Sequence, residues 1–176
     1  MFSQGSGSPK ESLQLGQVLQ DTMALVSYQT ALEGIEITKS MDAHLPPLYA
    51  NIHEVREVFL NLILNAVQSI GSRGRIHVGI KYHSKDRVIE IQISDTGKGI
   101  EAEHIEKLFN PFFTTRHDAL GLGLFVTKQI IHRYGGSIRV ESRLGEGSLF
   151  TVCFPCSEIG WSLPSPDADS LSLFPV

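Results

Sequence analysis

The sequence has 176 residues, of which 41% are hydrophobic and 19% are charged, and its formal net charge is −4. This length allows one domain with a substantial core, and the composition is ordinary for a globular protein. The small negative charge provides no basic surface, so we expect no nucleic acid as a partner.

The two ends of the chain differ in composition from its middle. Residues 1–12 begin in a Gly- and Ser-rich stretch and residues 157–176 are rich in Ser, Pro and Asp, so both are predicted to be flexible tails around one domain at residues 13–156. No apolar run approaches the ~18 residues that span a bilayer, and the N-terminus lacks the apolar segment of a signal peptide. We therefore expect a cytoplasmic domain, and membrane anchoring of a longer parent protein stays open.

Hydrophobic periodicity predicts mixed helices and strands in chain order. A helix over residues 12–34 ends near Gly34 and is followed by a strand at 35–41, a loop with two prolines and a long helix at 52–71. Strands at 75–83 and 87–95 form a hairpin, a short helix covers 102–109, and an irregular stretch runs to Leu120. A helix at 121–135 and strands at 137–143 and 148–154 complete the domain. Because strands and helices do not alternate regularly, we predict an α+β two-layer sandwich.

The long helix at 52–71 carries a narrow polar stripe on an otherwise apolar surface. A stripe of acids and amides without lysine suits a cavity that holds a cation or a ligand, although it could also face bulk water. Its members lie within about 40° of one line at helical spacing: Glu54, Glu57, Asn61, Asn65 and Gln68.

Asp95 ends a strand whose alternate residues are isoleucines. In an extended strand it shares a face with Ile89, Ile91 and Ile93, so its carboxylate is predicted to point toward the core. A buried carboxylate needs a donor, which is either a structural turn amide or a ligand.

Glycines gather after this aspartate and again before the last helix, at positions 97, 99, 121 and 123. Exposed backbone amides without a Cβ form anion sites, although each pair alone is also ordinary turn chemistry. The P-loop and dinucleotide fingerprints are both absent. The pair Cys153 and Cys156 ends a strand, and its context favours neither a redox motif nor a zinc site.

Four segments occur in order between residues 61 and 124: "NLILNA", "DTGKGI", "LFNPFFTT" and "GLGL". This order resembles the ATP-binding catalytic domain of sensor histidine kinases, in the superfamily shared with gyrase, MutL and Hsp90-type chaperones. The segments resemble that family's N, G1, F and G2 boxes, and the resemblance extends from Leu15 to Pro155. It implies a Bergerat-type fold, a mixed sheet covered on one face by helices.

The resemblance also implies roles for individual residues. Asp95 would accept a hydrogen bond from the adenine amino group, and Asn61 and Asn65 would lie beside a Mg²⁺ ion that bridges the phosphates. Catalytic roles fall to Glu57, Asn61 and Arg116, with Glu57 either a general base or only part of the polar stripe. The expected ATP-binding residues are Asn61, Asn65, Asp95, Gly97, Lys98, Gly99, Ile100, Phe109, Thr115, Gly121, Leu122, Gly123, Leu124 and Ser148.

Residues 110–120 lack a helical or strand period and are predicted to form a mobile lid that carries Arg116. The resemblance implies that the lid is anchored by Phe109, Phe112 and Phe113. Where many relatives have Gly-Thr before "GLGL", this chain has Ala119 and Leu120. Alanine does not share glycine's access to positive φ, so lid closure is expected to be restricted.

The implied reaction is transfer of the γ-phosphate of Mg-ATP to a histidine on a dimerisation domain that this chain lacks, since no histidine precedes His44. The expected partners are that phosphoacceptor domain and a response regulator receiver domain, and the isolated domain is expected to be monomeric. Two alternatives stay open: a nucleotide-dependent interaction module, and a gyrase- or chaperone-type ATPase that uses Glu57 as its base.

Overall fold

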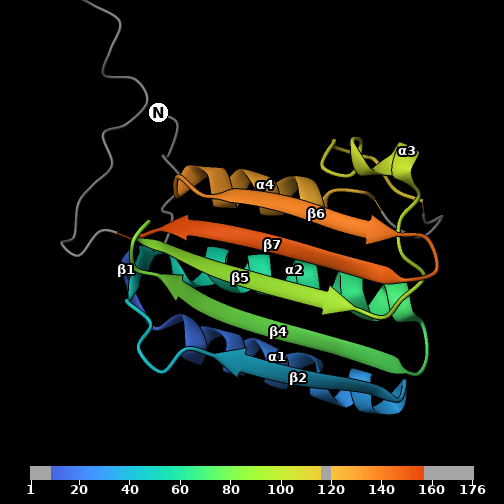
Figure 1. Ribbon diagram of the computed structural model, residues 1–176, viewed down its shortest axis with the longest axis horizontal. Helices are drawn as coiled ribbons and strands as arrows, with labels where there is room; N and C mark the ends of the chain where they lie inside the picture. The colour runs from blue at the N-terminus through green and yellow to red at the C-terminus, as the bar shows by residue number, and fades with distance from the viewer. Residues whose placement is uncertain (1–8, 116–119, 157–176) are drawn as a thin grey trace, which may run out of the picture.

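The computed structural model describes residues 9–115 and 120–156. A five-stranded mixed sheet forms one layer, in the order β2-β4-β5-β7-β6. Its strands are β2 (Ile35–Met41), β4 (Gly74–His83), β5 (Val88–Asp95), β7 (Gly147–Pro155) and β6 (Ser137–Arg143). β2 and β4 are parallel, and every other neighbouring pair in this sheet is antiparallel (Figure 1).

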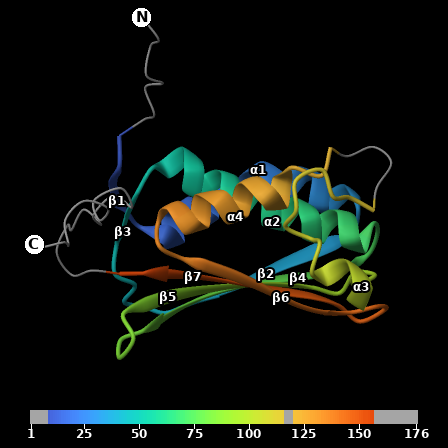
Figure 2. The ribbon, with the colours of Figure 1, turned by 90° about the horizontal axis from the view of Figure 1, so that it is seen from above.

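The helices form the second layer, on one face of the sheet. Figure 2 shows α1 (Leu15–Leu32), α2 (Ile52–Ile70) and α4 (Gly123–Arg133) side by side above the strands, with the short α3 (Ala102–Ile105) near one end. The predicted α+β two-layer sandwich, with helices on one face of a mixed sheet, is confirmed. None of the helices within the described residues is long and apolar enough to cross a membrane.

The core lies between the two layers, where α2 and β5 meet. The inward residues Ile89, Ile91 and Ile93 of β5 are at most 1% exposed, and Phe59 of α2 is 1% exposed. Asn51 caps the N-terminus of α2. Its side-chain oxygen accepts hydrogen bonds from the backbone amides of His53 and Glu54, at 2.8 and 3.2 Å. Because α2 is fixed by the core and by this cap, its polar stripe has a defined direction.

Two short strands were not predicted. β1 (Glu11–Leu13) and β3 (Leu48–Ala50) pair antiparallel, so residues 11 and 12 belong to a sheet rather than to the N-terminal tail or to the first helix, which begins at Leu15. Leu13 and Leu48 are each 4% exposed, and their burial holds the pair in place. Three residues are too few to show a strand period, which explains the difference.

Two other predicted helices are also shorter than expected. Only residues 102–105 of the predicted 102–109 segment are helical, and turns follow them. The last helix begins at Gly123 rather than residue 121, because Gly121 has a φ of +67°, which is not helical.

The thiols of Cys153 and Cys156 are free, and burial raises the pKa of both.

Candidate functional site

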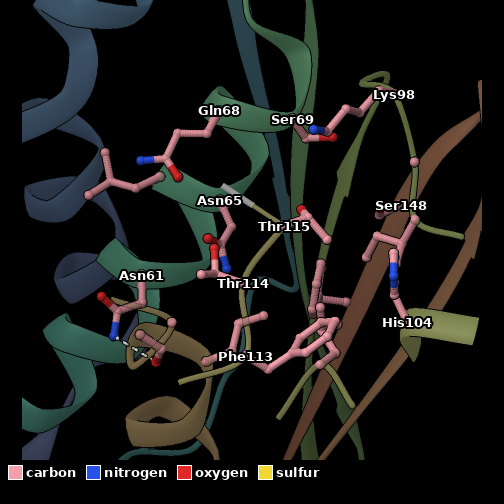
Figure 3. A pocket seen from close by; sticks show the side chains of 18 of the residues that line it. Asn61, Asn65, Gln68, Ser69, Lys98, His104, Phe113, Thr114, Thr115 and Ser148 are labelled. Atoms are coloured by element: carbon pink, nitrogen blue, oxygen red, sulfur yellow. Dashed lines mark hydrogen bonds between the residues drawn. The ribbon is translucent and has the colours of Figure 1, made fainter. Parts of the chain in front are cut away.

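A cavity of about 660 Å³ opens between α2, α4 and the C-terminal end of β5. Figure 3 shows the amide side chains of Asn61, Asn65 and Gln68 on the α2 side and Ser148 and His104 on the other side, with residues 113–115 between them in this view. The floor comes from Asp95, and Ser148 and Phe150 of β7 also line the cavity. The segments that line it are separated in sequence by up to about 90 residues, and the two-layer fold brings them together.

Asp95 lies at the base of the cavity and is 7% exposed. Its Oδ1 accepts a hydrogen bond of 2.8 Å from the amide of Gly97. Burial raises the pKa of this carboxyl, and hydrogen bonds from the Gly97 amide, the Ser69 side chain and the Ser148 backbone partly oppose that rise. The two explanations offered by the sequence are therefore compatible, because Asp95 binds a turn amide and also faces the cavity.

The polar stripe of α2 divides into two parts. Asn61, Asn65 and Gln68 line the cavity. Glu54, one end of the stripe, contacts α4 instead: it forms an ion pair with Arg133 and accepts a hydrogen bond from the Tyr134 hydroxyl. The stripe is thus structural at its N-terminal end and faces the cavity at its C-terminal end.

Glu57 lies between these two parts. It is exposed on α2 and is not among the residues that line the cavity. A general base must reach the attacking group directly or through one water, and this structure does not put Glu57 on the cavity wall.

Asn61 is held by α4. Its amide nitrogen donates to the carbonyl oxygen of Gly123 and to the hydroxyl of Thr127, each at 3.2 Å. Thr127 is completely buried. This threonine was not predicted, although its position four residues after Gly123 on the inward face of the helix is a usable signal.

Ser69 and His104 are among the lining residues that were not predicted. Ser69 lies four residues after Asn65, which places it on the same side of α2, and its side chain hydrogen-bonds Asp95. His104 lies on α3 and lines the cavity, with its ring centroid 5.5 Å from that of Phe113. Neither residue lies in one of the four boxes, so no motif pointed to them.

The glycines are required by close packing of the chain. A Cβ on Gly99, whose φ is +70°, would lie 1.9 Å from the carbonyl oxygen of Arg143. A Cβ on Gly97 would lie 2.5 Å from the carbonyl carbon of Ser69. These contacts account for both glycines without a ligand, and Gly99 additionally lines the cavity whereas Gly97 does not.

Most of the predicted site residues meet at this cavity. Glu57, Gly97 and Phe109 are not on its wall, and Phe109 instead lies under the Lys128 ammonium, 5.5 Å from the ring centroid. Arg116 and Ala119 lie outside the described residues. The predicted residues that do line the cavity are Asn61, Asn65, Asp95, Lys98, Gly99, Ile100, Thr115, Gly121, Leu122, Gly123, Leu124 and Ser148.

The sequence model of the histidine kinase-, DNA gyrase B- and HSP90-like ATPases matches residues 50–158, which contain the whole cavity. The chain belongs to this family. The resemblance that the four boxes indicated is thereby confirmed.

Similar proteins within the family are sensor kinases. The chain is 37% identical over 145 residues to the sensor histidine kinase ZraS of Klebsiella oxytoca, which covers 82% of this chain and 31% of ZraS. It therefore spans about a third of the length of that curated relative.

Solved structures of histidine kinases share the fold. The catalytic domain of histidine kinase ThkA has a TM-score of 0.75 at 26% identity, covering 83% of this chain and 97% of that domain. Full-length ShkA in complex with AMPPNP also gives a TM-score of 0.75, at 25% identity, with 83% of this chain and 31% of ShkA covered. ThkA in complex with the response regulator TrrA gives 0.72 at 25% identity, with 83% and 41% covered. The chain thus corresponds to the catalytic ATPase domain of such kinases.

Proposed function

We propose that this domain binds Mg-ATP in the cavity and donates the γ-phosphate to a histidine on the dimerisation domain of a sensor kinase. The observation that carries the proposal is the convergence of one buried carboxylate, two amide side chains and a helix N-terminus on one cavity. It is supported by the kinase relatives, including one solved with an ATP analogue.

Asp95 supplies the recognition of the base. Its carboxylate can only accept hydrogen bonds when ionised, so it matches the exocyclic amino group of adenine. The Gly97 amide occupies one side of Oδ1, which fixes the direction in which the carboxylate faces. Ser69 and Ser148, both on the cavity wall, hold the same carboxylate.

The phosphates belong at the other end of the cavity, at the start of α4. Leu122, the residue before this helix, makes no side-chain capping bond, so the first amides of α4 are not occupied by a cap. Free amides and the positive end of the helix dipole favour an anion. Gly123 is the first helical residue and leaves this end open to a ligand.

The donor set on α2 fits Mg²⁺. This ion prefers oxygen ligands and keeps several waters, and Asn61 and Asn65 each offer an amide oxygen beside the place proposed for the phosphates. A bound Mg²⁺ would neutralise charge that develops on the transferred phosphoryl group. The residues of the chain would hold the nucleotide in line with the incoming histidine and exclude water, with no covalent nucleophile of their own.

A test uses the purified chain, labelled ATP and the histidine hairpin of the parent kinase supplied as a separate polypeptide. We expect acid-labile, base-stable label on the hairpin and none on the chain alone, and Asn65→Ala should abolish the transfer. Stoichiometric label on any of the seven histidines of this chain would contradict the proposal. A receiver domain is the proposed next acceptor, by analogy with the ThkA complex.

The second candidate function is steady ATP hydrolysis with Glu57 as the base, as in gyrase- or chaperone-type members of the family. The exposed position of Glu57 away from the cavity wall does not favour it. Steady hydrolysis by the isolated chain that is lost in Glu57→Gln would support this alternative. A chain that binds ATP but neither hydrolyses nor transfers it would support the nucleotide-dependent interaction module.

A further inference from the structure

We propose that Thr127 is a positioning residue that holds the side chain of Asn61 in the orientation that leaves its amide oxygen, rather than its nitrogen, free for the cation that accompanies the nucleotide. The inference rests on the proposed function of the cavity and assigns a role to a buried residue outside the four boxes. It begins with the two hydrogen bonds that join Asn61 to α4.

An asparagine side chain has two chemically different ends. Its oxygen accepts hydrogen bonds and ligates cations, and its NH₂ group only donates. Rotation by 180° about the last side-chain bond exchanges them, so an asparagine beside a cation needs a partner that selects one orientation. Asn61 lines the cavity and is only partly buried, so packing alone does not make that selection.

Helix α4 supplies the selection through the Gly123 carbonyl, which can only accept, and the Thr127 hydroxyl holds the selected orientation by giving Nδ2 a second acceptor. The Gly123 carbonyl oxygen and the Thr127 hydroxyl oxygen each lie 3.2 Å from Nδ2 of Asn61. With the amide turned over, Oδ1 would face the Gly123 carbonyl oxygen, and two acceptors would repel each other. In Figure 3 a dashed line starts at the amide nitrogen of Asn61, and the amide oxygen points away from it.

Thr127 is suited to this role because its side chain is confined. It is completely buried, it is β-branched, and it lies in the second turn of α4, which limits its rotamers. The Gly123 carbonyl, by contrast, lies in the first turn of the helix and lines the cavity. We infer that the threonine keeps the amide orientation fixed when a ligand at the helix N-terminus disturbs the glycine.

The test compares the nucleotide affinity of the 176-residue chain with and without Mg²⁺, by calorimetry with ADP in excess Mg²⁺ and in EDTA. Thr127→Val keeps the shape of the side chain and removes the hydroxyl. We define the gain from Mg²⁺ as the ADP affinity in Mg²⁺ divided by that in EDTA. We expect unchanged affinity in EDTA and a gain from Mg²⁺ that is roughly three- to tenfold smaller, which corresponds to one hydrogen bond. Thr127→Ser restores the hydroxyl and should stay within about twofold of the original chain.

Thr22→Val is the matched control. Thr22 is also completely buried, and its hydroxyl donates to the Val18 carbonyl at 2.8 Å, but it lies on α1 and is not on the cavity wall. It should lower stability without changing the gain from Mg²⁺. This separates the positioning role from loss of a buried hydroxyl in general.

The outcomes are distinguishable. An unchanged Mg²⁺ gain in Thr127→Val, or an equal loss in Thr127→Ser, would overturn the inference while leaving the proposed function intact. An original chain that binds no nucleotide would overturn both. If Thr127→Val does not fold, NMR on the original chain decides instead: protected side-chain NH₂ protons of Asn61 support the role, and freely exchanging ones refute it.

Discussion

The amide of Gly97 donates to Oδ1 of Asp95 over 2.8 Å, two residues after the strand that buries the aspartate has ended. This bond fixes a carboxylate that is 7% exposed and faces the cavity. It satisfies only one of several acceptor positions on the group. Ser69 and Ser148 also hydrogen-bond to the carboxylate, and the acceptor capacity that is left is what a ligand can use.

Asp95→Asn should weaken ADP binding by roughly 10- to 100-fold, which corresponds to loss of a hydrogen bond to a charged group. The new amide presents donors where the adenine amino group needs an acceptor. Calorimetry on both proteins measures the change. Asp86→Asn, in the exposed turn between β4 and β5, is the control and should bind normally. Equal affinity for the original chain and Asp95→Asn would remove this residue from the base pocket.

The same substitution should make the free domain more stable at neutral pH. Burial raises the pKa of Asp95 above its ordinary value of 3.8, so the folded chain holds this proton more tightly than the unfolded chain. Between the two pKa values the folded state binds more protons, and its stability falls as pH rises. The asparagine of the variant would keep an acceptor for the Gly97 amide without the cost of a buried charge.

Thermal melts of the two proteins between about pH 3 and pH 7 test this expectation. The variant should melt roughly 2–4 °C higher at neutral pH, the shift that about 1 kcal/mol produces in a chain of this size. Its advantage should shrink as pH falls toward 3.8, the ordinary pKa of the group. An advantage that is constant with pH would show that the charge of Asp95 is not its source.

Strict periodicity predicted β5 and its buried aspartate correctly, because alternation along a strand depends only on backbone geometry. It also gave the long helix α2 to within one residue of its observed end. The three-residue strands β1 and β3 were missed, since their pairing depends on burial of Leu13 and Leu48 by residues far away in sequence.

The division of the α2 stripe was also beyond the sequence. A helical wheel gives the direction of each side chain around α2, but it does not show which element packs against that side chain. Helix α4 runs antiparallel to α2, so that Arg133 reaches Glu54 while Gly123 reaches Asn61. That packing turns Glu54 into a structural residue and leaves Asn61 at the cavity. It also explains why Thr127, which lies outside the four boxes, was overlooked.

Gly99→Ala and Gly123→Ala should have opposite effects on stability. At position 99 the backbone has positive φ, and a Cβ would lie 1.9 Å from the Arg143 carbonyl oxygen, so we expect a loss of about 2–4 kcal/mol. At position 123 the nearest atoms to a Cβ are those of the Asn61 side chain at 3.8 Å, an ordinary contact, and alanine suits a helix.

Urea unfolding of the two glycine variants measures the difference. We expect Gly123→Ala to be neutral or to gain up to about 1 kcal/mol, because alanine restricts the unfolded chain more than glycine does. A Gly99→Ala chain within about 0.5 kcal/mol of the original would mean that the turn between β6 and β7 moves away easily. In that event the close contact would not explain the glycine.

Tyr134→Phe should destabilise the domain by about 1–2 kcal/mol, because it removes a hydroxyl that joins α4 to the start of α2. That hydroxyl donates to Glu54 and accepts the amide of Asn51 at 3.0 Å, on a side chain that is 6% exposed. Without it, the Asn51 amide loses this buried partner. Tyr28→Phe, on the exposed side of α1, is the matched control and should change stability little.

The stability difference between the original chain and Tyr134→Phe should also depend on pH in alkali. Burial and the hydrogen bond to Glu54 raise the pKa of Tyr134 from 10.0 to about 12, so the folded state keeps a proton that the unfolded state releases. Stability contributed by this hydroxyl is complete below pH 10 and is lost as pH rises toward 12.

Other groups titrate in the same range, so the quantity to measure is the stability of the original chain minus that of Tyr134→Phe, from urea unfolding at successive pH values. This difference should fall steadily above pH 10. A difference that stays constant up to the highest pH at which the domain folds would show that the phenol is not held by Glu54 in solution.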